Sequence, residues 1–93
     1  MITLIDNYVV DVSQYNYILM IDKNRLDKNG KPVYETVGYY HSIEGAILAA
    51  KEHHIKKQFY GDTFSLSEAI QIIKQVNSEF YDLLNEVLKN DRD

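Results

Sequence analysis

The spacing of apolar and polar positions changes near residue 41, and the change predicts strands before helices. Residues 1–41 are rich in β-branched and aromatic side chains. Apolar and polar positions alternate there, and a period of two residues is typical of half-buried strands. Residues 42–89 repeat their apolar positions about every 3.6 residues, the period of an amphipathic helix. Strands followed by helices are typical of α+β proteins. We therefore expect a three-stranded antiparallel sheet followed by two helices, in the order βββαα.

Turn signals divide the strand region into three. The strongest is Asn29-Gly30, a dipeptide that favours a two-residue hairpin loop of type I′ in which both residues take positive φ. Pairing across such a loop would place Leu26 opposite Val33. The same pairing would place Met20 opposite Tyr39. The expected strands comprise residues 2–12, with a bend at 6–7, then 15–26 and 33–41.

Capping signals predict where the two helices begin. Ser42 can serve as the N-cap of a first helix that covers residues 43–57. Ser65 and Glu68 match a capping box, in which the serine accepts from the third amide and the glutamate reaches back. A second helix is therefore expected over residues 66–89. Its apolar positions fall on one side of a helical wheel: Leu66, Ala69, Ile70, Ile73, Val76, Phe80, Leu84 and Val87.

Length and composition fit one small cytoplasmic domain. The 93 residues suffice for a single domain, with the sheet in 1–41, the helices in 42–89 and a frayed polar tail at 90–93. The absence of cysteine excludes disulfides and thiolate metal sites. The first residues lack the basic region and the unbroken apolar region of a secretory signal peptide. No stretch is apolar enough to span a membrane, so we expect no membrane partner. A net charge of −4 argues against simple charge-driven binding to nucleic acid.

The sequence contains none of the common catalytic or cofactor motifs. The histidines are His41, His53 and His54, and the two adjacent ones would point about 100° apart on a helix, so they cannot share a metal as an i, i+4 pair does. The four glycines are too dispersed to form a phosphate-cradling loop. We expect no metal, no cofactor and no catalytic residue, and we favour binding over catalysis. An enzyme of unrecognised type is the remaining alternative.

The second predicted helix carries a row of carboxylates opposite its apolar stripe. Such a row could engage a basic groove, as a protein that blocks a nucleic-acid-binding site would do by presenting carboxylates where phosphates lie. A solvated helix face is the ordinary alternative. The candidate partner-binding residues are Glu68, Glu79, Asp82 and Glu86.

Positive charge gathers elsewhere, so the chain is electrostatically bipolar. A β-ribbon with basic edges can enter a major groove, which makes a nucleic-acid-binding accessory protein the alternative function. Lysines at a strand edge also serve simply to prevent strand-to-strand aggregation. The candidate nucleic-acid-binding residues at the hairpin are Lys23, Arg25, Lys28 and Lys31, and Lys51, Lys56 and Lys57 stand on the first helix.

Two segments carry a resemblance to a known group of proteins. The segments "YNYIL", residues 15–19, and "GYYHSIEGA", residues 38–46, resemble small uncharacterised proteins of phages and prophages of Gram-positive bacteria. The resemblance covers roughly residues 7–88. It implies a host-directed factor in the cytoplasm of an infected bacterium, such as an inhibitor of a CRISPR nuclease or another nucleic-acid-binding defence complex. It implies no activity and no catalytic residues.

The second helix is apolar over a wider arc and a greater length than a domain of this size can cover. Pairing of identical patches is the commonest way for proteins to cover such a surface. We therefore expect a homodimer. Its interface would comprise Phe80, Leu84 and Val87.

Overall fold

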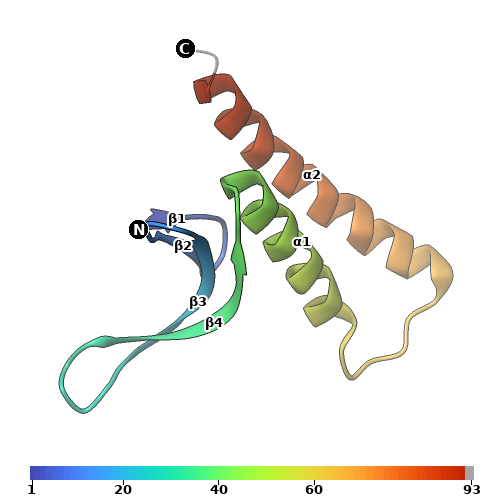
Figure 1. Ribbon diagram of the computed structural model, residues 1–93. Coiled ribbons are helices and arrows are strands. Elements are labelled where there is room, and N and C mark those ends of the chain that lie inside the picture. Colours follow the sequence, from blue (N-terminus) through green and yellow to red (C-terminus); the bar gives the residue numbers. More distant parts are fainter. Residues whose placement is uncertain (92–93) are drawn as a thin grey trace. The chain divides into compact units, whose positions relative to one another are not determined.

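The protein is an α+β structure that divides into two compact units. A computed structural model describes the backbone of residues 1–91 and the side chains of residues 1–86. Residues 1–46 form the first unit, which contains an antiparallel sheet and the first turn of a helix. The second unit begins at Ile47 and contains the rest of that helix and a second one (Figure 1). The predicted class is confirmed. The expectation of a single domain stays a prediction.

The sheet has four strands, so the prediction of three was wrong. The segment expected to be one long strand bends back on itself. The amide of Tyr8 donates to the carbonyl of Ile5 at 3.2 Å, the amide of Leu4 donates to the carbonyl of Tyr8 at 2.8 Å, and Asp6 takes φ 53 within the turn. The bend expected at residues 6–7 is therefore a complete hairpin. The strands are β1 Ile2–Thr3, β2 Tyr8–Val12, β3 Tyr17–Leu26 and β4 Pro32–Tyr40, and they lie in the order β1-β2-β3-β4.

The loop between β3 and β4 is a type I turn closed by a glycine, and the type I′ prediction was wrong. Gly30 takes φ 80, but Asn29 does not take a positive φ. The carboxylate of Asp27 accepts from the amides of Asn29 at 2.8 Å and Lys31 at 2.9 Å, and the amide of Gly30 donates to the carbonyl of Asp27 at 3.0 Å. Aspartate at the first position and glycine at the fourth are typical of this turn. The aspartate side chain therefore outweighs the Asn-Gly signal.

Two bulges shift the pairing of β3 with β4. Leu26 pairs with Pro32 instead of Val33, and Met20 pairs with Thr36 instead of Tyr39. The register slips between Leu19 and Met20, and again between Asp22 and Leu26. Figure 1 shows the hairpin extending beyond β1 and β2 toward its loop. Bulges bend and twist a strand. The predicted register failed because it assumed uninterrupted pairing from the loop.

The second irregularity lies in the most exposed part of the hairpin. From Asp22 to Leu26 the chain takes four residue steps on β3 against two on β4, from Tyr34 to Pro32. Asn24 takes φ 56 there, and its amide donates to the Asp22 carboxylate at 2.9 Å. Asparagine tolerates this left-handed conformation better than most residues. The side chains of residues 23–25 therefore leave the regular alternation of the strand.

Most buried apolar side chains of the first unit come from its central strands β2 and β3. Val10 and Leu19 are fully buried, and Tyr8 is 3% exposed. Burial raises the pKa of the Tyr8 phenol from its usual 10 to about 12, and the negative charge of Asp6 adds to the rise. The neutral phenol is therefore the form that the folded chain favours.

Stability is expected to fall in strong alkali because of Tyr8. Below pH 10 the phenol is protonated in both states. Between pH 10 and about 12 the unfolded chain loses that proton while the folded chain keeps it. The free energy of unfolding should then fall by about 1.4 kcal/mol per pH unit from this group. Urea unfolding at both ends of this range, compared with Tyr8→Phe, measures the contribution. An equally steep fall in the variant would contradict it.

The helices lie close to where the sequence predicts them. Helix α1 spans Ile43–Phe59 and α2 spans Leu66–Asp91, each two residues longer than expected. Ser42 caps α1, because its Oγ accepts from the amide of Gly45 at 3.0 Å. The capping box of α2 is also confirmed: Ser65 Oγ accepts from the Glu68 amide at 3.1 Å, and Glu68 Oε1 accepts from the Ser65 amide at 3.3 Å. The predicted tail at 90–93 thus begins within α2, and residues 92–93 lie outside the described backbone.

The helices of the second unit pair in antiparallel fashion. The loop between them contains Gly61 at φ 85 just after α1 ends, and Phe59 meets Phe64 edge-on at 5.3 Å between ring centroids. Farther along, the ring of His54 lies 6.2 Å from that of Phe80. Phe80 is 1% exposed. Residues later in α1 therefore lie beside residues earlier in α2.

Candidate functional site

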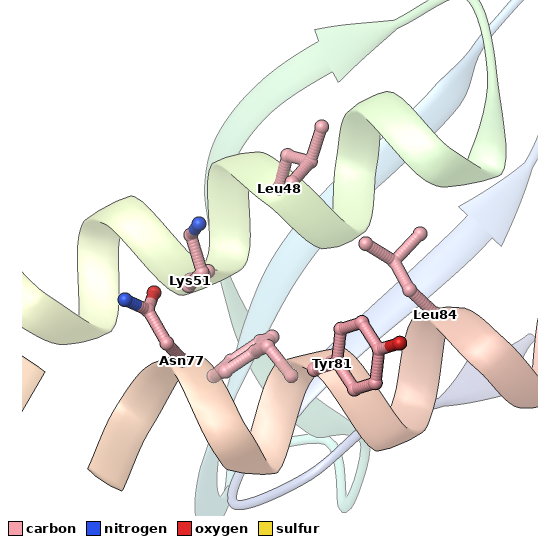
Figure 2. A pocket seen from close by; sticks show the side chains of 6 residues that line it. Leu48, Lys51, Asn77, Tyr81 and Leu84 are labelled. Atoms are coloured by element: carbon pink, nitrogen blue, oxygen red, sulfur yellow. The ribbon is translucent and has the colours of Figure 1, made fainter. Parts of the chain in front are cut away.

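A groove of about 230 Å³ lies between α1 and α2. Figure 2 shows Leu48 and Lys51 on α1 and Asn77, Tyr81 and Leu84 on α2 around it. Leu48 is 44% exposed and Tyr81 is 65% exposed, so apolar surface reaches solvent at this groove. Its lining comprises Leu48, Lys51, Asn77, Phe80, Tyr81 and Leu84.

The residues predicted for a dimer interface differ in how far they are buried. Phe80 is buried in the chain, so its ring is not a free surface for a second copy. Leu84 is half-buried and lines the groove. The side chain of Val87 lies outside the described residues. If two copies pair here, the exposed ring of Tyr81 and the side chain of Leu84 would make the contact, and the homodimer stays a prediction.

We expect the wild-type chain to have the mass of a dimer in light scattering at micromolar concentration. Leu84→Asp should shift that mass toward a monomer, because a charge would be buried unpaired in a symmetric interface. Leu26→Asp is the matched control, because Leu26 is 65% exposed at the end of β3. A monomeric wild type, or a dimer that survives Leu84→Asp, would contradict the prediction.

A second, smaller hollow of about 110 Å³ is lined from both helices by mostly polar side chains. The ring nitrogen Nε2 of His54 lies 3.3 Å from Nε2 of Gln58 on the same helix. Glu79 of α2 stands at this hollow. No group of three or more histidine, aspartate or glutamate side chains suited to a metal occurs in the part of the chain that the structure describes. The lining comprises His54, Gln58, Ile72, Gln75, Val76 and Glu79.

All four predicted carboxylates are exposed, but they do not form one group. Glu68 caps the start of α2 through its hydrogen bond with the Ser65 amide. Glu79, Asp82 and Glu86 follow at spacings of three and four residues, so they lie in line over about 10 Å of helix. We call these three the acidic row. Positions three and four residues from Glu79 and Asp82 hold no lysine or arginine, and Glu86 has one such neighbour, Lys89.

The hairpin cations are exposed as well. Lys23 and Arg25 lie in the bulged part of β3, and Lys28 and Lys31 lie at the loop. Residues 22–31 carry four cations and two aspartates, a net charge of 4 − 2 = +2. Both aspartates accept hydrogen bonds from backbone amides, so they shape the hairpin and also lower its charge.

Sequence reasoning missed one basic hollow on α1. It has a volume of about 320 Å³ and is lined by His53, Lys56, Lys57 and Tyr60. Residues separated by three, four and seven positions share one face of a helix, so this spacing could have been found in the sequence. Tyr60 is 89% exposed, which no periodicity argument would have revealed.

Comparisons with known protein families, curated proteins and solved structures gave no match. Neither of the two helices, over the residues that the structure describes, combines the length and apolar character needed to cross a membrane.

Proposed function

We propose that the chain is a non-enzymatic binding protein whose acidic row engages a basic groove of a partner protein. The observation that carries the proposal is the row itself: three exposed carboxylates in line on α2. Like charges at such spacings destabilise a helix by about 0.2–0.5 kcal/mol per pair. If this helix face were only solvated and had no binding role, the helix would be more stable with lysine or arginine placed between the carboxylates. A basic partner would turn this repulsion into attraction.

The partner's groove is one that ordinarily binds phosphates. A straight row of carboxylates offers such a groove negative charges in sequence, as a nucleic-acid strand does. The resemblance to small phage and prophage proteins supports a host target, and an inhibitor of a defence nuclease fits both arguments. The row is the binding element of this proposal, and Glu68 is left to its capping role.

The basic hairpin supports a second candidate, an accessory protein that binds nucleic acid. Lys23, Arg25, Lys28 and Lys31 are all exposed, and their stretch carries a net positive charge. A β-ribbon with such edges can enter a major groove. This candidate predicts a nucleic acid as the direct ligand, whereas the acidic row predicts a protein.

Affinity capture separates the two candidates. The immobilised chain is exposed to bacterial lysate at about 50 mM and about 500 mM salt, with and without nuclease. Nuclease treatment separates the two candidates, and the higher salt weakens charge-driven contacts of either kind. If the acidic row is the binding element, the chain should capture a basic protein. That capture should persist after nuclease treatment and be lost at high salt. Recovery that disappears on nuclease treatment would contradict it and show that the captured ligand is a nucleic acid.

A further inference from the structure

A basic hollow on α1 stands apart from the acidic row and from the groove between the helices. Its lining comprises three residues of α1 and the residue that follows the helix: His53, Lys56, Lys57 and Tyr60. Among the side chains that the structure describes, no carboxylate lines it. Its volume of about 320 Å³ lies at the lower end of the range for small-molecule sites. The hollow therefore combines positive charge with an aromatic ring in a space that a small anion would not fill.

The structural role of the lysines does not explain the whole arrangement. Lys56 and Lys57 lie in the last turn of α1, where cations interact favourably with the helix dipole. That effect requires no aromatic neighbour. Tyr60 is 89% exposed, so its ring gains almost nothing from packing within the chain. An exposed aromatic beside two ammonium groups is the arrangement with which proteins hold nucleotides, by stacking on the base and neutralising the phosphate.

We propose that this hollow binds a nucleotide unit, with the phosphate held by Lys56 and Lys57 and the base stacked on Tyr60. The ligand is a free nucleotide or one unit of a single strand, because both present a phosphate and a planar base. The site is separate from the acidic row, which lies on α2 and takes a ligand of opposite charge. Either proposal can fail without the other.

Fluorescence anisotropy with a labelled ten-nucleotide single strand tests the site, with unlabelled strand, AMP and inorganic phosphate as competitors. The wild type should bind the strand with a dissociation constant of about 10⁻⁴ to 10⁻⁶ M near physiological salt. Lys56→Glu with Lys57→Glu should weaken binding more than tenfold. Tyr60→Ala should weaken it about tenfold, and Tyr60→Phe should not, because stacking needs the ring and not the hydroxyl.

Lys28→Glu with Lys31→Glu makes the same change of charge at the hairpin, which is the competing candidate site for nucleic acid. It should weaken binding less than threefold.

The competitors identify the ligand. If AMP competes as strongly as the unlabelled strand, the site binds free nucleotides. If only the unlabelled strand competes, the site binds a single strand. Both outcomes support the proposal. It is overturned if no binding occurs at millimolar protein, if the hairpin pair weakens binding as much as the α1 pair, if Tyr60→Ala binds normally, or if inorganic phosphate competes as well as AMP.

Discussion

Replacing Phe80 by alanine is expected to lower the free energy of unfolding by about 3–5 kcal/mol. The side chain is 1% exposed and lies beside His54 between the helices. Truncation removes buried apolar surface and leaves a cavity that the neighbouring side chains fill only in part. A domain of this size has a total stability of about 5–15 kcal/mol, so the variant would lose a large share of it.

The neighbouring Tyr81 provides the control for Phe80. It is 65% exposed, so Tyr81→Ala should change stability by less than about 1 kcal/mol. Urea unfolding followed by circular dichroism measures both variants. Similar small losses at the two positions would show that the α1–α2 pairing is not the stabilising contact that the structure indicates.

Helix positions followed from local signals, which is why the sequence predicted them well. Ser42 and Ser65 each accept a hydrogen bond from an amide three residues ahead, and this geometry depends only on neighbours in the chain. The spacing of the acidic row also follows from the helical period alone. Its members were therefore identified correctly as exposed, although the period could not reveal that Glu68 is engaged at the helix cap.

The strand errors arose where single side chains decide the backbone path. The hairpin between β1 and β2 has no glycine or proline, and Asp6 supplies the left-handed residue that its turn requires. At the next hairpin, two hydrogen bonds to the Asp27 carboxylate select the turn. Neither choice follows from alternation of apolar and polar residues.

The groove between the helices could not be predicted because it depends on which residues of α1 face which residues of α2. Leu48 and Tyr81 are 33 positions apart in the sequence and line one groove. Only the antiparallel packing brings them together. The basic hollow on α1 is different, since the spacing of its residues on one helix is already visible in the sequence.

Reversing the acidic row should abolish partner binding without unfolding the chain. Glu79→Lys, Asp82→Lys and Glu86→Lys change exposed side chains, so the fold should be retained. Three lysines would face a basic groove, and like charges across an interface cost several kcal/mol. The dissociation constant of a captured partner should therefore rise about a hundredfold or more.

A second triple variant separates the row from net charge. Asp11, Glu35 and Glu52 are exposed and lie outside α2. Reversing them to lysine changes the formal charge from −4 to −4 + 6 = +2, which is the same change as reversing the row. At about 150 mM salt the Debye length is about 8 Å, so charge outside the contact itself contributes little to binding. The control should therefore keep its affinity within a few fold.

Equilibrium titration of the captured partner with the wild type and the two triple variants, at that salt concentration, is the most direct test of the acidic row. The proposal predicts tight binding by the wild type and the control and loss of binding by the variant with lysines at positions 79, 82 and 86. Equal affinity of the two triple variants would contradict it, whether both bind as tightly as the wild type or both fail to bind.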